Sequence, residues 1–116
     1  MSDRLRLPTR RPILTNRLAD PLSGQYWHFT TGFDHQGRVR EIFLDSSGRA
    51  GAPFDALIHD MCIMASRDCL QRGLSARDLL RNLSERPPSL LAAALAETVK
   101  LETEVGPEFA RLILEG

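Results

Sequence analysis

The fold of this chain is decided by the stretch from Gly37 to Asp60, GRVREIFLDSSGRAGAPFDALIHD. The residues from Val39 to Leu44 predict a short strand, and a glycine-bearing loop follows from Asp45 to Ala52. An apolar helix is expected to begin near Pro53, because proline suits a first helical position. A strand–loop–helix joint of this kind presents backbone N–H groups at the helix start, and these groups favour anions.

The residues before this stretch predict the strands that complete a sheet. Side chains alternate from Gly24 to Phe33, and the residues on one face are Trp27, Phe29, Thr31 and Phe33. We interpret this face as the one that packs on the core. Asp34 suits the first position of a tight turn and Gly37 can adopt a positive φ, so a hairpin is expected. The segment from Ile13 to Leu18 predicts a first strand, which would make the sheet a three-strand meander.

The main helix is predicted from Pro53 to Arg72, with Gly73 just past its end. Its apolar residues recur with the i, i+3, i+4, i+7 spacing of one buried face. The residues expected on that face are Phe54, Leu57, Ile58, Met61, Cys62 and Ala65. We therefore expect this helix to cover one face of the sheet.

Further helices are predicted after the main one. Ser75 suits an N-cap and Asp78 follows three residues later, as in a capping box, so a helix is expected from Ala76 to Leu83. Ser89 begins a third helix, LLAAALAETVKLETE, and a last short helix is expected from Glu108 to Leu114. Strands followed by helices predict an α+β fold, a small antiparallel sheet (hairpin or three-strand meander) covered on one face by two to three helices.

Length and composition predict one small globular protein. The chain has 116 residues, and its 15 basic and 15 acidic residues cancel, so no net charge selects nucleic acid or an anionic membrane. We divide the chain into a basic extended arm at 1–12, an α+β domain at 13–84 and a C-terminal helical extension at 85–116 packed on the same domain. No signal peptide or membrane span is recognised, so a cytoplasmic protein is expected.

The reactive side chains predict neither a catalytic nor a metal site, and no cofactor is expected. Cys62 and Cys69 lie too far apart on one helix for a disulfide between them, so we interpret them as packing thiols. His59 precedes Cys62 by three residues, but two ligands do not make a zinc site. Helical geometry directs Cys62 to the core and His59 outward, which also disfavours a nucleophile–base pair.

The order of these elements and their residues resembles the TSCPD domain. The motifs are GRVREIFLD, then SGRAG and a helix of small and large apolar residues, then GLSARDLLRNL, over roughly residues 6–84. TSCPD domains occur near the C-terminus of adenosylcobalamin-dependent ribonucleotide reductases and as short stand-alone bacterial proteins, whose start the opening RLPTRR resembles. The resemblance implies an accessory or interaction module associated with ribonucleotide reductase. We expect this module to be non-catalytic by itself, because a chain of this length cannot contain the large catalytic barrel of the reductase.

Two groups of residues are candidate contacts. The glycine loop, with Ser47, Gly48, Arg49 and Gly51, is the candidate for binding an anion or ligand. Arg49 and Ala52 stand where the TSCPD domain carries lysine and serine. The candidate contact for a partner protein is the arm, with Arg6, Arg10 and Arg11.

Three alternatives stay open beside docking on the reductase. The loop could serve a small protein that binds a nucleotide or phosphate ligand. The arginine arm, with Trp27, Phe29 and Phe33 as a stacking platform, could bind single-stranded nucleic acid weakly, although an isoelectric point near 6.8 counts against this. A homodimer could form through the apolar spacing of Leu90, Leu91, Leu95 and Val99 in the third helix.

Overall fold

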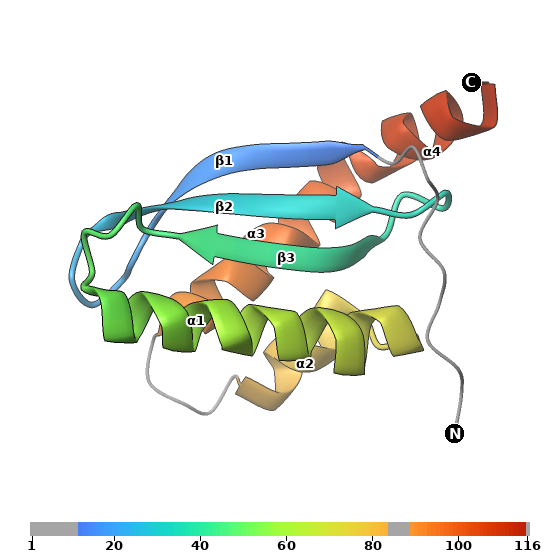
Figure 1. Cartoon of the computed structure of the whole chain (residues 1–116). Coiled ribbons are helices and arrows are strands. Elements are labelled where there is room, and N and C mark those ends of the chain that lie inside the picture. Colours follow the sequence, from blue (N-terminus) through green and yellow to red (C-terminus); the bar gives the residue numbers. More distant parts are fainter. Residues whose placement is uncertain (1–11, 84–88, 116) are drawn as a thin grey trace.

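The computed structural model describes residues 12–83 and 89–115, in which a three-stranded antiparallel sheet is followed by helices (Figure 1). The strands are β1 (Ile13–Ala19), β2 (Tyr26–Phe33) and β3 (Val39–Asp45), and they pair in the order β1-β2-β3. The predicted α+β meander is confirmed. The predicted arm at 1–12, with Arg6, Arg10 and Arg11, lies outside the described residues except for Pro12.

One face of the sheet forms the core. The side chains of Trp27 and Phe29 are 1% exposed and that of Phe33 is fully buried. Ile42 and Leu44 of β3 are buried on the same face of the sheet. The core face predicted from the alternation in β2 is therefore confirmed, and its aromatic rings are not free to stack on a base.

No described helix covers the opposite face of the sheet, which is turned toward the viewer in Figure 1, and we call it the open face. Tyr26 and His28 of β2 are exposed on it. The guanidinium of Arg17 in β1 lies 4.3 Å from the centre of the Tyr26 ring, within the range of a cation–π contact. The ring of Phe43 in β3 is stacked on that of His59, with 6.1 Å between the ring centres.

The helices follow the sheet in the chain. They are α1 (Ala52–Met64), α2 (Ala76–Leu83), α3 (Leu90–Glu104) and α4 (Gly106–Glu115). A π-helical turn, Ala65–Cys69, and a 3₁₀ turn, Leu70–Arg72, continue α1 as far as Gly73, whose φ of 104° ends the helix. The predicted capping box at α2 is confirmed, because Ser75 and Asp78 each accept a hydrogen bond from the other's backbone N–H, at 3.0 and 3.2 Å.

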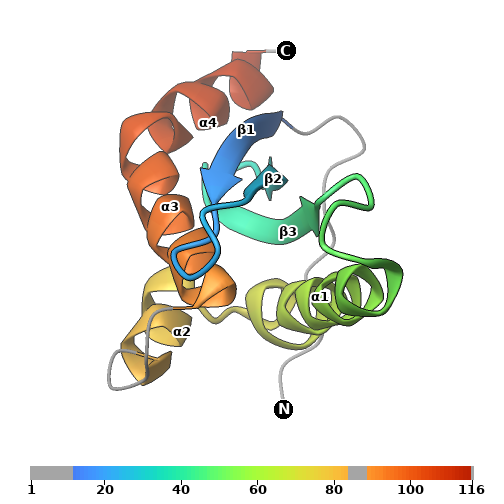
Figure 2. The same cartoon turned by 90° about the vertical axis from the view of Figure 1, so that its left-hand side faces the viewer.

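The expectation that the helix from Pro53 buries one broad face on the sheet is wrong. Ile58 and Cys62 are buried, but Phe54, Leu57 and Met61 are 43%, 54% and 36% exposed. Figure 2 shows the reason: α3 lies against the core face of the sheet, while α1 runs beside β3. Because a strand edge is narrower than a sheet face, α1 buries only a thin strip of its surface.

The outer edge of β3 is closed by side chains from the two turns that follow α1. Ser66 Oγ accepts a hydrogen bond from the N–H of Ile42 at 2.9 Å and lies 3.3 Å from the Ile42 carbonyl oxygen. Gln71 Nε2 donates to the carbonyl oxygen of Arg40 at 3.2 Å. In the middle of β3, outward backbone groups of Arg40 and Ile42 are thus paired inside the protein.

Candidate functional site

The predicted glycine loop folds around a carboxylate of the chain itself. Asp55, in the first turn of α1, reaches back over the loop, and its Oδ2 accepts from Ser46 Oγ at 2.6 Å and from the N–H of Gly48 at 3.1 Å. Its Oδ1 accepts from the N–H of Ser46 at 3.3 Å. The hydrogen bond from the Ser46 hydroxyl, helped by those from the backbone, lowers the pKa of Asp55.

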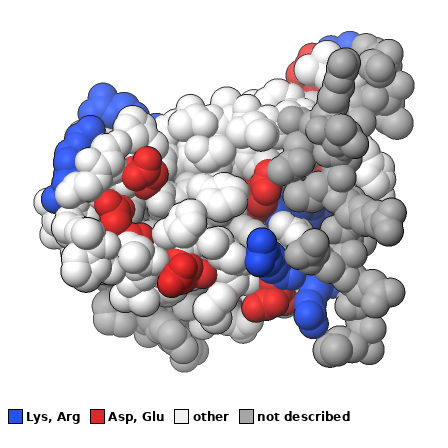
Figure 3. All heavy atoms as spheres, viewed as in Figure 1, with Lys and Arg blue, Asp and Glu red and all other residues white. Residues whose placement is uncertain are grey.

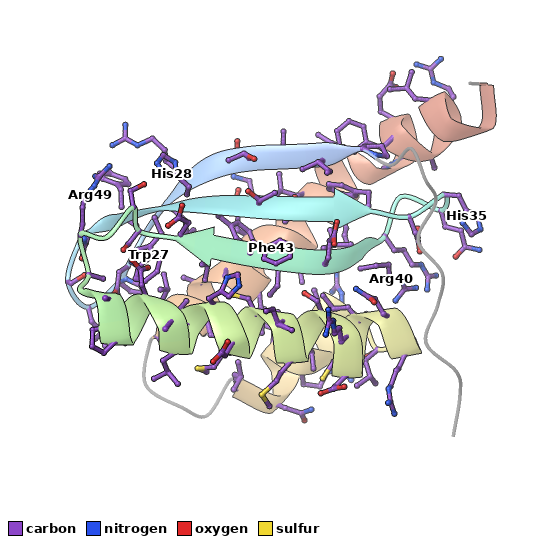
Figure 4. The ribbon with its side chains drawn as sticks, in the orientation of Figure 1. Trp27, His28, His35, Arg40, Phe43 and Arg49 are labelled. Atoms are coloured by element: carbon purple, nitrogen blue, oxygen red, sulfur yellow. The ribbon has the colours of Figure 1, made fainter. Side chains whose placement is uncertain are left out.

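The four loop residues singled out from the sequence are brought together at the start of α1. Ser47, Gly48 and Gly51 all have positive φ, at 56°, 81° and 91°, which explains the glycines but makes Ser47 a less usual occupant. Arg49 is exposed and lies with His28 at one end of the sheet (Figure 4). Because Asp55 already supplies the loop with a negative charge, binding of an external anion there stays a prediction.

The reactive side chains do not form a catalytic pair. Burial raises the pKa of the Cys62 thiol to about 11, so this cysteine is a neutral packing group at neutral pH. His59 is exposed and stacks on Phe43, on the other side of α1, while Cys69 is half-buried and its thiol is in no disulfide. Within residues 12–83 and 89–115 no three metal-binding side chains gather, and no helix is long and apolar enough to cross a membrane.

The outward surface of α1 is the feature that sequence reasoning missed. Phe54, Leu57 and Met61 remain more than a third exposed, although the Phe54 ring meets the edge of the Trp27 ring at 5.9 Å, and Met64, 60% exposed, extends the row by another turn. We call these four residues the α1 apolar row. It borders a groove of about 470 Å³ whose other lining residues include Leu22, Leu90 and Leu91.

This groove joins elements that are far apart in the chain. Leu22, in the loop between β1 and β2, is 75% exposed, and Leu90 and Leu91 begin α3. Asp20 lies at the groove and adds a negative charge to a lining that is apolar apart from Ser89. The sequence did carry a signal for this surface: α1 contains more large apolar residues than a strand edge can bury.

Comparisons of the chain with protein-family models, with curated proteins and with solved structures found no match.

Proposed function

We propose that this protein is a non-catalytic docking module of the TSCPD type, and that its partner is a ribonucleotide reductase. The observation that carries the proposal is the α1 apolar row, Phe54, Leu57, Met61 and Met64, which is at least 36% exposed at every position. Single exposed apolar residues are common, but a contiguous row beside a groove is typical of a surface that binds another protein.

The chemistry of this surface suits a protein partner. The row and the groove offer large apolar side chains with one carboxylate, that of Asp20, at the groove. A partner helix or loop with apolar anchors and a basic residue would complement it. Two of the four residues in the row are methionines, whose flexible side chains adapt to the shape of a partner.

The loop at the start of α1 adjoins the row, since Phe54 lies in the first turn of the helix. Arg49 is exposed there and could add an ion pair at the rim of the contact (Figure 4). The sequence-based proposal that the loop contacts the partner is thus compatible with a surface centred on α1, while the arginine arm lies outside the described residues. The resemblance to the TSCPD domain is what names the reductase as the partner.

The alternatives have less support. A phosphate ligand in the loop would have to displace or approach the Asp55 carboxylate, which the loop hydroxyl and amides already bind. Single-stranded nucleic acid would need exposed rings, whereas Trp27, Phe29 and Phe33 lie in the core.

The proposal is tested by measuring binding of the purified protein to the purified reductase from the same source. Leu57→Asp places a charge in the middle of the α1 apolar row, and we expect affinity to fall by about tenfold or more, as for a buried interface residue. Leu112→Asp is the matched control, because Leu112 in α4 is similarly exposed, at 49%, but lies outside the groove. Its affinity should stay within about twofold of the original.

The outcomes test the identity of the partner and the location of the contact surface separately. Absence of binding by the unchanged protein contradicts the reductase as partner. Equal binding by both aspartate variants leaves the partner in place but contradicts the α1 surface. In that case the triple variant Arg10→Ala, Arg11→Ala, Arg49→Ala should lose binding, as expected from the sequence alone.

A further inference from the structure

The backbone of β1 leaves half of its hydrogen-bonding groups turned away from the sheet. The carbonyl oxygen of Pro12 accepts from the N–H of Phe33 at 3.0 Å, and the N–H of Asp20 donates to Gln25 at 2.8 Å. Because successive residues of an antiparallel strand turn to opposite sides, the even-numbered residues between these two face β2. The N–H and C=O groups that point to the outer edge belong to Ile13, Thr15, Arg17 and Ala19.

This outer edge differs from that of β3. No hydrogen bond from the described residues reaches the outward backbone groups of β1. Arg17 is the only charged side chain in the strand. Its guanidinium lies over the Tyr26 ring on the open face and not at the outer edge of the strand. Figure 3 shows a rim above β1 that carries neither Lys or Arg nor Asp or Glu along most of its length.

The strand also lacks the usual features that block pairing. Natural proteins protect edge strands with proline, a bulge, short length or charged side chains. β1 is seven residues long, contains no proline, and pairs with β2 in unbroken register from Ile13 to Ala19. An edge of this kind is a template for one more antiparallel or parallel strand.

We propose that the edge of β1 pairs with β1 of a second copy of this chain, antiparallel and across a twofold axis at Asn16. The strand is complementary to itself in this register. Ile13 then stands opposite Ala19 of the partner subunit and Thr15 opposite Arg17 of the partner subunit, so every outward N–H and C=O group finds a partner. On the core side, Leu14 meets Leu18 of the partner subunit.

The neighbouring registers are worse for stated reasons. An axis at Arg17 would place two guanidinium groups directly opposite each other, which is destabilising. An axis at Thr15 or Leu18 would leave outward groups at one end without a partner. A shift of the register between the two copies of β1 by one residue would pair odd-numbered residues with even-numbered ones. The N–H and C=O groups of the even-numbered residues already bond to β2, so they cannot bond across the dimer. The axis at Asn16 therefore gives the most complete pairing.

The product is one continuous sheet of twice three strands, with the core faces of both copies on the same side. A contact made by a single strand pair is smaller than a standard protein interface, so the dimer should be concentration-dependent. The paired residues of β1 include none of the α1 apolar row, although Asp20 and Leu22 of the groove follow β1 directly.

Mass in solution tests the dimer. Light scattering on the full chain should give 13.0 kDa when dilute, rising toward twice that value between roughly 10 µM and 1 mM. Thr15→Pro removes an outward N–H that the sheet does not use and should keep the protein monomeric throughout. Thr15→Ala is the matched control, since it loses the same side-chain hydrogen bond to Thr30 Oγ1 but keeps the N–H, and it should dimerise like the original.

A cross-link tests the register even if the proline variant does not fold. Residues facing each other at a non-hydrogen-bonded position have Cα atoms about 4.5 Å apart, which a disulfide can span. Asn16→Cys should therefore form a covalent dimer on mild oxidation, whereas Thr15→Cys should form little. A monomer at every concentration, together with no cross-link through residue 16, overturns the proposal. A dimer that Thr15→Pro leaves intact and Asn16→Cys does not trap also overturns it, because another surface must then be responsible.

Discussion

The two edge strands of the sheet differ in how their outward backbone N–H and C=O groups are paired. β3 lies beside α1 and the turns that follow it, and side chains such as Ser66 and Gln71 pair its outward backbone groups. β1 lies at the other edge, where its outward N–H and C=O groups meet no described part of the chain. Burial explains the difference: covered backbone groups must be paired, while exposed ones can bond to water.

The comparison shows where the chain can accept a partner. At β3 a new strand would have to displace intramolecular hydrogen bonds, one of them from the buried Ser66 side chain. At β1 it would displace no hydrogen bond made by residues 12–83 or 89–115. The position of α1 beside β3 also determines which residues of the helix are buried. Its narrow buried strip packs against the strand edge, and the α1 apolar row stays exposed.

The largest effect is expected from breaking the ion pair that holds the β3 edge in place. Asp34 Oδ2 lies 2.9 Å from Arg40 Nε, both side chains are at most 7% exposed, and Arg40 also donates to the carbonyl of Leu70 at 2.9 Å. Asp34→Ala leaves the guanidinium buried without its partner, so the free energy of unfolding in urea should fall by about 3–5 kcal/mol. Glu108→Ala, which breaks the exposed pair with Arg111, should cost less than about 1 kcal/mol. Equal losses in both variants would contradict the buried role of Asp34.

A smaller effect is expected at the centre of the closed edge. Ser66→Ala removes the oxygen that accepts from the N–H of Ile42 and leaves that buried N–H unpaired. The free energy of unfolding should fall by about 1–3 kcal/mol. Thr103→Ala is the control, because Thr103 bonds a carbonyl four residues back, as Ser66 does, but is exposed. If Ser66→Ala is no more destabilising than the control, the edge does not depend on this hydroxyl.

The smallest effect is a pH dependence at the start of β3. Burial raises the pKa of Glu102 above its usual 4.5, despite a hydrogen bond from the N–H of Val39. The folded protein therefore holds the proton of the Glu102 carboxyl group more tightly than the unfolded chain does. The stability that this protonation contributes is present below pH 4.5 and is lost as the pH rises through the folded pKa of Glu102.

Glu102→Gln cannot ionise and keeps an acceptor oxygen for Val39. Its melting temperature should exceed that of the original protein at neutral pH, and the gain should vanish below about pH 4. Glu104→Gln, on an exposed part of α3, should show no such crossover. A gain from Glu102→Gln that is the same at both pH values would assign the effect to something other than this proton.

Much of the fold could be predicted from local sequence signals. The alternation of Trp27, Phe29 and Phe33 identified the core face, and Ser75 with Asp78 fixed the start of α2. These signals work because they depend on neighbours in the chain. The place of α1 could not be predicted in the same way, since helical spacing shows which residues share a side but not whether a sheet face or a strand edge lies against it.

The candidate site was less predictable for the same reason. The glycine loop could be located, but the carboxylate that fills it comes from Asp55 in the first turn of α1, outside the loop. Three residues of the α1 apolar row, Phe54, Leu57 and Met61, were assigned to the buried face because apolar side chains are usually buried. A meander places β1 at an edge of the sheet, but whether other parts of the chain cover that edge is a property of the tertiary structure.

Residue-resolved amide hydrogen exchange at two protein concentrations tests the contrast between the edges most directly. The N–H of Ile42, bonded to Ser66, should exchange slowly at both concentrations. The N–H groups of Thr15 and Arg17 should exchange rapidly in dilute protein and become protected when the protein is concentrated, as the second copy replaces water. Thr15 and Arg17 amides that exchange at the same rate at both concentrations, or an Ile42 amide as fast as theirs, would contradict the account.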